Sequence, residues 1–498
     1  MLLLGDFMDN YSIWENKKKT RKKIDKLLDT DTDILIIGGG ITGITAAYLL
    51  MNSNKKITLI DKSLIGMGVT SKTTAKLNYL QGTIYQDLEK AFDRKTSKLY
   101  FDSQVEAIDL IRKIIKKEKI NCDLEECDSF IFTKEEKGIK KINAEKEILE
   151  SWDIKCRTVS ELPIHFPIKC GVVTQDTYTF NPLKYIDTLK KVLEKKIDIS
   201  EDTTAFEITN IDDKFQTKTN QGTITSKYVI VACHYPFFII PGFIPIKTYI
   251  KREYVNASKF DLESSPFTAI SIDNTLHSIR FYKDYIIYGS NKHRLTNNIE
   301  YKDNYDQSQN DFKRLFSKEP EYTWMNQDIV SNDNLPIIGV VDKKQPNLLI
   351  ATAFGAWGMT NGTIAAKILA DIILGNDNKY IDLFNPQRIN STGIFNSIIG
   401  ALHYSKAYIQ TTVKKNPVFY NDHVYIVKID GKYYGVYYDY YGKKHIVDHK
   451  CPHMKCNLVF NDEEKTWDCP CHGSRFDIDG NVLEGPANYS ITVNFKKN

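Results

Sequence analysis

The sequence lacks an uninterrupted apolar stretch long enough to cross a membrane. Its most apolar segment, residues 229–246, is interrupted by Pro236, Pro241 and Pro245, and proline breaks a spanning helix. The first ten residues contain no basic region ahead of an apolar one, as a secretory signal would require. We therefore expect no transmembrane segment and no signal peptide, and we predict a cytoplasmic location.

The sequence also lacks a strong excess of charge of either sign. It contains 67 lysines and arginines against 63 aspartates and glutamates, a formal net charge of +4 at pH 7. Proteins that bind nucleic acid usually carry a pronounced basic surface, so we expect no nucleic-acid partner. At 498 residues the chain is long enough for roughly two to four domains.

Cysteine is too sparse for a disulfide scaffold, and its placement is uneven. Four of the nine cysteines lie between residues 451 and 471. The other five are scattered, and we interpret them as isolated or buried thiols: Cys122, Cys127, Cys156, Cys170 and Cys233. The four clustered cysteines are therefore the candidates for a functional site.

A nucleotide-binding pattern begins in the first strongly apolar run. The run DILIIG, residues 33–38, is typical of a buried parallel strand, and ITGITAAYLLMN after it is typical of a helix. Gly38, Gly40 and Gly43 form the pattern GxGxxG between them, and a second buried strand ends at Asp61. Such glycines let a pyrophosphate approach the helix N-terminus, and the acid binds ribose hydroxyls. This context favours nucleotide binding over a glycine-rich structural turn.

Two later segments rich in glycine and threonine favour FAD over NAD. The loop after the acid, GMGVTSKTTAK, offers backbone and hydroxyl donors close to a pyrophosphate. The segment FGAWGMTNG, residues 354–362, opens another helix that we expect to end at Gly375. A helix N-terminus aimed at a flavin would stabilise the negative charge that develops on reduction. The cofactor contacts expected in these segments are Thr73, Thr74, Ala75, Gly355, Gly358 and Met359.

These motifs, together with TTAK at 73–76 and DNLPIIG at 333–339, resemble the FAD-dependent oxidoreductases of the glycine oxidase and D-amino acid oxidase type. The chain is most similar to the bacterial branch that carries a C-terminal Rieske domain, and the likeness extends from Ser12 to Pro486. The resemblance implies a glutathione-reductase-like α/β Rossmann fold with an inserted α+β substrate domain, followed by an all-β Rieske domain. Substrates in that superfamily are mostly amines and amino acids, oxidised by hydride transfer to the flavin.

The composition and the resemblance together predict a division of the chain. An arm at 1–32, which we expect to be loosely held, precedes the oxidoreductase at 33–376, and a linker at 377–416 precedes the Rieske domain at 417–498. The amphipathic segment near 390–410 is interpreted as part of the linker rather than a membrane-surface helix, because its polar face has no basic cluster. The expected FAD-binding parts are about 33–98, 168–236 and 327–376, and the expected substrate domain is about 99–167 and 237–326.

Two short loops near the C-terminus, CPHMKC and CPCHGS, carry cysteine and histidine. Cys451, His453, Cys469 and His472 give the pattern CxHx15CxxH. Thiolate and imidazole at this spacing bind either zinc or a [2Fe-2S] cluster in which two histidines replace two cysteines on one iron. Zinc loops more often use CxxC or HxxxH, so the pattern favours a Rieske cluster over zinc.

The family pattern implies a role for each residue of these loops. The two cysteines of the pattern hold the buried iron, and the two histidines hold the outer iron. Cys456 and Cys471 form a disulfide that joins the loops, and GPA at 485–487 matches the loop that covers the cluster. Imidazole ligation leaves the cluster less negative than thiolate ligation alone, so it should accept electrons readily.

Two residues depart from the family pattern. Ser474 stands where a hydroxyl is expected to bond a bridging sulfide, but Phe476 replaces the tyrosine that bonds a cysteine sulfur in high-potential members. We therefore expect a middling reduction potential. Lys455 replaces a usual glycine, and a residue with a side chain resists positive φ, so the backbone conformation of that loop does not follow from the pattern.

Two other uses of a Rieske domain find no support in the sequence. A ring-hydroxylating oxygenase needs a second, mononuclear iron site, and none of the ten histidines forms the usual acid-xx-His-xxxx-His pattern. A reductase fed by NADH usually carries a second dinucleotide fingerprint, and we find none. We expect a dehydrogenase that oxidises a small amine or amino-acid-like substrate and passes electrons through the cluster to an external acceptor, such as a redox protein or a quinone. The alternative is a non-catalytic electron-transfer or redox-sensing protein.

Two stretches in the expected substrate half carry residues that could bind a carboxylate or an amine. They are Arg252 and Tyr254 in KREYV, and His293 and Arg294 in SNKHR. Surface or structural roles are the commoner explanation for basic residues on loops, and Asp333 in DNLPIIG is similarly ambiguous. The substrate, the acceptor and the oligomeric state do not follow from the sequence.

Overall fold

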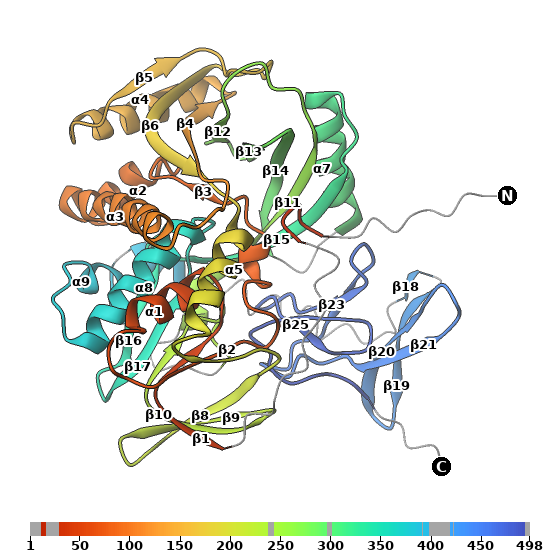
Figure 1. Cartoon of the computed structure of the whole chain (residues 1–498). Helices are drawn as coiled ribbons and strands as arrows, with labels where there is room; N and C mark the ends of the chain where they lie inside the picture. The colour runs from red at the N-terminus through yellow and green to blue at the C-terminus, as the bar shows by residue number, and fades with distance from the viewer. Residues whose placement is uncertain are drawn as a thin grey trace.

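The computed structural model describes residues 11–15, 29–237, 244–295, 301–390, 392–397, 419–421 and 423–493. Three sheet-based units make up this part of the chain (Figure 1), and the colours show that the first two combine segments distant in sequence. Most of the segment expected to form an amphipathic linker falls outside the described residues.

The first unit is an eight-stranded sheet with a parallel centre. Its strands are β1 (Thr30–Ile37), β2 (Ile57–Ile60), β7 (Asp198–Ser200), β8 (Ala205–Ile211), β9 (Lys214–Thr219), β10 (Gly222–Val231), β16 (Ile337–Asp342) and β17 (Gln345–Thr352). The order is β16-β17-β10-β1-β2-β7, with β9 paired to β10 and β8 to β9. Strand β1 is parallel to both β2 and β10, and all four residues of β2 are buried, as in a sheet covered on both faces. The predicted strand, helix and strand at the start of the chain are confirmed.

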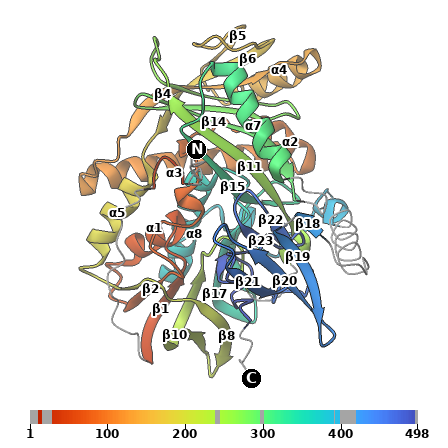
Figure 2. The ribbon, with the colours of Figure 1, turned by 90° about the vertical axis from the view of Figure 1, so that its right-hand side faces the viewer.

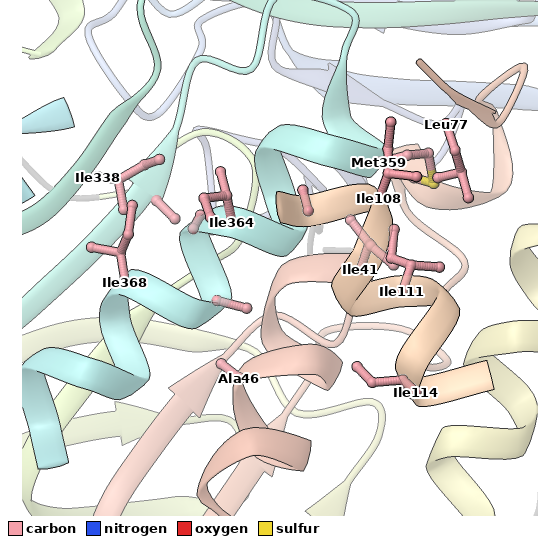
Figure 3. Packing of buried hydrophobic residues seen from close by; sticks show 14 of the residues in the cluster. Ile41, Ala46, Leu77, Ile108, Ile111, Ile114, Ile338, Met359, Ile364 and Ile368 are labelled. Atoms are coloured by element: carbon pink, nitrogen blue, oxygen red, sulfur yellow. The ribbon is translucent and has the colours of Figure 1, made fainter. Parts of the chain in front are cut away.

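Three helices pack together beside this sheet: α1 (Ile41–Leu50), α3 (Arg94–Glu118) and α8 (Gly358–Leu374). Helix α5 (Pro182–Leu193) packs on α1, and α9 (Ile381–Phe384) packs on β16. Helix α8 ends at Gly375 in a left-handed conformation with φ +72, as the sequence predicts. Figure 3 shows the apolar side chains that meet between the three helices, among them Ile41, Ala46, Ile108, Ile111, Ile114, Ile364 and Ile368.

The second unit is a nine-stranded, mostly antiparallel sheet inserted into the first. Its strands are β3 (Lys76–Leu77), β4 (Glu125–Thr133), β5 (Cys156–Val159), β6 (Cys170–Thr179), β11 (Thr248–Lys259), β12 (Phe267–Ser271), β13 (His277–Tyr282), β14 (Tyr285–Arg294) and β15 (Tyr322–Ser331). The order is β15-β11-β14-β13-β12-β4-β6-β3, with β5 beside β6. The helical elements of this unit and its connections are η1 (Val69–Ser71), α2 (Ile84–Ala91), α4 (Glu136–Glu150), α6 (Ile244–Lys247) and α7 (Tyr301–Phe316).

The C-terminal unit consists of two four-stranded sheets. One contains β18 (Phe419–Asn421), β19 (Val424–Ile429), β20 (Lys432–Tyr438) and β21 (Lys444–Asp448), and the other β22 (Val459–Asn461), β23 (Thr466–Asp468), β24 (Arg475–Phe476) and β25 (Val482–Glu484). The hairpin turn predicted at Asp430 and Gly431 joins β19 to β20, and both residues have positive φ. Figure 2 shows this unit, in blue, beside β11 and β15. The predicted fold class, α/β with an inserted sheet domain and a C-terminal all-β region, is confirmed.

The described part of the N-terminal arm is held against η1 and the nine-stranded sheet, contrary to the expectation of a loose arm. The Ser12 hydroxyl donates to the carbonyl oxygen of Ser71 at 2.5 Å, and the Trp14 indole N–H donates to that of Thr73 at 2.7 Å. Both side chains are buried. Residues 11–15 therefore brace the loop in which cofactor contacts are expected.

Among the described residues, no helix is both long and apolar enough to span a bilayer.

Close packing between α1 and α8 depends on Gly362. A Cβ at this position would lie 2.7 Å from Thr42 Oγ1 and 2.8 Å from Ile41 Cγ2, so Gly362→Ala should cost on the order of 1–3 kcal/mol of stability. Urea unfolding followed by far-UV circular dichroism measures this. Gly68→Ala is the matched control, because nothing lies within 4 Å of the added Cβ there. Equal midpoints for the two variants would contradict the prediction.

Candidate active site and metal centre

The fingerprint glycines let β1 turn directly into α1. Gly38 has φ +105, and a Cβ there would lie 2.5 Å from the carbonyl oxygen of Ala232. A Cβ at Gly43 would collide with the carbonyl oxygen of Gly38, and one at Gly40 would lie 3.1 Å from Thr70 Oγ1. Side chains are therefore excluded where the backbone must approach a pyrophosphate.

Asp61 follows β2 and turns back onto this loop. Its Oδ2 accepts the Gly39 N–H at 2.7 Å, and its Oδ1 accepts the Ser63 N–H at 2.8 Å. Burial raises the pKa of this carboxyl, and the two N–H donors oppose that rise. A carboxylate has more acceptor sites than these two bonds use, so the placement fits the predicted contact with ribose hydroxyls.

A buried arginine that the sequence analysis did not name holds the loop that contains Thr73, Thr74 and Ala75, called here the second cofactor loop. Arg280 on β13 donates to the carbonyl oxygens of Ala75 at 3.0 Å and Phe180 at 2.8 Å, and to that of Thr74. Ala75 has φ +51, a conformation that a residue with a side chain adopts only when its surroundings impose it. Burial lowers the pKa of Arg280 to about 9, so it remains a cation at neutral pH.

The second cofactor loop and the N-terminus of α8 meet at one polar pocket. Thr73 and Thr74 line it from the loop, and Trp357 and Met359 line it from the start of α8. Gly355, with φ +61, and Gly358 belong to the same turn into the helix. The remaining walls come mainly from the nine-stranded sheet and include Lys76, Glu253, Ser278, Lys292 and Asn326. The segments expected to contact FAD therefore converge on a pocket that the substrate sheet closes.

Lys76 is the most strongly perturbed cation of this pocket. Its Nζ donates to Ser278 Oγ at 2.7 Å and to Thr74 Oγ1 at 3.1 Å. Burial lowers its pKa to about 7, although the carboxylate of Glu253 acts in the opposite direction. Lys76 thus changes charge near neutral pH, inside a site with an acid, an amide and a second lysine.

The four residues suggested as substrate contacts do not line this pocket. Arg252 Nη1 lies 2.8 Å from Asp468 Oδ2 of the C-terminal unit, and neither side chain is exposed. The ring of Tyr254 stacks on that of His293, and the guanidinium of Arg294 lies 4.6 Å from the centre of the Tyr249 ring. The structure places these side chains in packing and interface positions.

The sequence analysis did not predict Glu253 and Lys292, which line the pocket beside the residues it named. The alternation of side chains along a strand explains why. Successive side chains of a strand point to opposite faces, so Glu253 faces the pocket while Arg252 and Tyr254 face away from it. On β14, Lys292 lines the pocket next to His293. The stretches KREYV and SNKHR do contribute to the pocket, but the sequence did not show which of their side chains face it.

Asp333 serves the packing of the chain after α9. Its two carboxylate oxygens accept from Arg388 Nε and Nη2, both at 2.8 Å. Such a bidentate pair is a strong structural contact. Asp333, which the sequence left ambiguous between substrate binding and structure, therefore has a structural role.

The cysteine and histidine loops bring the four expected ligands together in pairs. Cys451 and Cys469 are buried, and a hydrogen bond between their thiols lowers the pKa of Cys451 to about 7. The rings of His453 and His472 lie 5.0 Å apart, nearly perpendicular. Two thiols and two imidazoles are the donor types that a Rieske cluster uses, so the arrangement agrees with the predicted ligand set.

The histidines are in the state that metal ligation requires. Burial lowers the pKa of His453 to about 4 and that of His472 to about 3, so both are neutral at pH 7. His453 Nδ1 is buried and has no hydrogen-bond partner among the described residues, an unusual state that a metal ion would explain. The residues present therefore fit the cluster.

The disulfide implied by the resemblance, Cys456–Cys471, is present and joins the two loops. These two sulfurs also lie within 4.8 Å of Cys469 Sγ, but cysteines in a disulfide offer no thiolate, so the three do not form a second metal site. Lys455 adopts φ +59, the left-handed conformation that the usual glycine would allow. The replacement has thus kept the shape of the loop.

The histidine rings contact the first unit of the chain. Tyr235, in the loop after β10, lies edge-on to both, with ring centres 6.5 Å from His453 and 6.2 Å from His472. The same loop contains Ala232, whose carbonyl oxygen lies against Gly38 of the dinucleotide fingerprint. The expected metal centre and the expected cofactor loop are therefore connected through one short segment.

His453→Ala should give protein without a Rieske EPR signal and with reduced iron, because the second iron loses an imidazole ligand. Metal analysis by mass spectrometry and EPR after dithionite measure both quantities. His165→Ala, at an exposed histidine far from the loops in sequence, should retain full iron and signal. Stoichiometric zinc in the unaltered protein would contradict the assignment.

Two family models match the chain. The model described as FAD dependent oxidoreductase matches residues 33–372, and the model described as Rieske [2Fe-2S] domain matches residues 411–494. The first covers well over half of the chain. Together they account for both halves of the site described above.

Similar proteins agree with this assignment. The protein YhfW of Bacillus subtilis strain 168, named as a putative Rieske 2Fe-2S iron-sulfur protein, is 32% identical over 474 residues, which is 92% of each chain. Among solved structures, glycine oxidase from Geobacillus kaustophilus has a TM-score of 0.60 at 12% identity and covers 72% of this chain and 99% of its own. L-Amino acid deaminase from Proteus vulgaris has a TM-score of 0.59 at 15% identity, with 76% and 100% covered. The chain belongs to the FAD-dependent oxidoreductase family, and it is an FAD enzyme with a Rieske [2Fe-2S] domain at its C-terminal end.

Proposed function

We propose that the protein is a dehydrogenase that oxidises a small amine or amino acid and delivers the electrons, through its Rieske domain, to an external one-electron acceptor. The observation that carries this proposal is the contact of both Rieske histidines with Tyr235, beside the dinucleotide loop. When bound, FAD accepts a hydride and the cluster carries single electrons. An enzyme that handed its electrons only to oxygen would have no use for that second centre.

The charges of the pocket match a substrate that carries both an amine and a carboxylate. Glu253 supplies a carboxylate for an ammonium group, and Lys76 and Lys292 supply cations for a carboxylate. Asn326, which pairs with Glu253 across β15 and β11, adds an amide that both donates and accepts. One structural neighbour, L-amino acid deaminase, acts by its name on amino acids, and this substrate class carries the same two groups.

Lys76 is the group whose charge should control substrate affinity with pH. Its pKa of about 7 means that it is cationic below that pH and neutral above it, so a carboxylate ligand should bind best below pH 7 and more weakly as the pH rises. Lys76→Met should weaken binding at pH 6 by about 10- to 100-fold and remove the pH dependence. The dissociation constant of acetate, followed by the absorbance of the bound flavin, measures this without an amine that titrates.

Lys218→Met is the control, because the Lys218 side chain is exposed, pairs with Glu207 and does not line the pocket. Lys76→Arg should keep acetate binding at pH 8, where binding to the unaltered protein is weakened, since arginine stays charged. A pH profile of Lys76→Met that matches the unaltered protein would contradict the assignment.

The proposed function is tested on the full chain under anaerobic conditions. Small amines and amino acids are added in turn while flavin absorbance and the Rieske EPR signal are recorded. A true substrate should bleach the flavin and then produce the Rieske signal, and Glu253→Gln should slow the bleaching by on the order of tenfold or more. The same variant should give a normal Rieske signal with dithionite. Bleaching that never produces the Rieske signal would refute the electron path, and no bleaching with any compound would favour a non-catalytic redox protein.

A further inference from the structure

The C-terminal unit packs against the side of β11 and β15 that faces away from the substrate pocket. Strands β11 and β15 pair with each other, Arg252 opposite Gln327 and Glu253 opposite Asn326. Glu253 and Asn326 line the pocket, whereas Arg252 reaches Asp468 and Gln327 Nε2 donates to the carbonyl oxygen of Gly473 at 3.0 Å. Gly473 lies in the CPCHGS loop, so only the thickness of this pair of strands separates the pocket from a cluster-binding loop.

A buried ionic network holds the C-terminal unit in this position. Besides Arg252, Asp468 contacts Arg475, whose guanidinium also lies 2.9 Å from Glu484 Oε1. Arg252 also donates from Nε to Gln327 Oε1 at 3.0 Å. Charges buried in this way are stable only when their partners hold a defined geometry, so the network selects one docked position of the unit.

Further contacts surround the cluster loops on other sides. Lys62, one residue after Asp61, donates to the carbonyl oxygen of Leu483 at 2.6 Å. Asn488 donates to the carbonyl oxygen of Phe206 at 2.8 Å, and the rings of Phe206 and Tyr489 stack. The contacts lie on elements that are far apart in the sequence, so together they limit sliding and rotation of the unit.

In this docked position the two histidine rings meet the flavoprotein. Tyr235 is 3% exposed and lies edge-on to both rings. An iron held by neutral imidazoles would carry less negative charge than one held by thiolates, so the histidine side would be the better site for an added electron. The loop of Tyr235 continues from Ala232, which touches Gly38.

We propose that Tyr235 is the contact through which electrons enter the cluster, and that the Arg252–Asp468 ion pair is the positioning element that keeps the two histidine ligands against it. This inference rests on the proposed function, since it names the route within the same electron path. Bound reduced FAD would supply its two electrons one at a time, and the cluster would carry each of them singly to an external one-electron carrier.

The test uses the holoprotein and needs no known substrate. Under anaerobic conditions, light with EDTA as the electron donor reduces the bound FAD, and the visible circular dichroism of the cluster then reports its reduction in time. Tyr235→Leu, which removes the ring, should slow the step from flavin to cluster by on the order of tenfold or more, because positioning of the two partners sets this rate. Tyr235→Phe, which keeps the ring, should remain close to the unaltered protein.

Arg252→Met should also slow this step. Tyr440→Leu is the matched control for Tyr235→Leu, since Tyr440 is 83% exposed in the turn after β20. Iron content and the EPR g-values of dithionite-reduced protein should be the same in all variants, which separates a lost contact from a damaged cluster. Unchanged transfer in Tyr235→Leu would overturn the role of Tyr235, and unchanged transfer in Arg252→Met would overturn that of the ion pair. If the unaltered protein shows no transfer from flavin to cluster, the proposed function itself fails.

Discussion

The alternation of side chains along β11 and β15 is the constraint on which both halves of the site depend. Because successive residues of a strand face opposite ways, a single pair of strands presents Glu253 and Asn326 to the pocket and Arg252 and Gln327 to the C-terminal unit. A shift of one residue in their register would exchange the two sets. The substrate site and the docking surface therefore cannot vary independently along these strands.

Buried charge does two different tasks in this protein. Arg280 is satisfied by backbone carbonyl oxygens and holds the loop of Thr73 and Thr74 beside the pocket. Arg252 is satisfied by a carboxylate from another unit and so orients one unit against the other. Burying such a group is costly unless its partners are in place. Both arginines thus favour one arrangement over looser alternatives, whatever their net contribution to stability.

Much of the fold and of the cofactor chemistry could be predicted from local sequence. The GxGxxG turn with Asp61, the helix that ends at Gly375 and the hairpin at Asp430 and Gly431 appear where the sequence indicates them. Each depends on the conformational freedom of glycine or on a short apolar run, which are local properties. The disulfide between Cys456 and Cys471 is also present, although it was implied by the family pattern and not by the spacing itself.

The sequence alone was sufficient to indicate the cofactors, because the residues expected to hold them lie in short segments whose spacing is set along the chain. It could not assign Arg252 to the C-terminal unit, since its partner Asp468 is 216 residues away and nothing local links the two. It also could not show that Lys76, Glu253 and Lys292 share one pocket, or that Arg280 holds its wall. Those relations arise only when distant strands pair in a particular register and bury particular faces, and register is a property of the folded sheet as a whole.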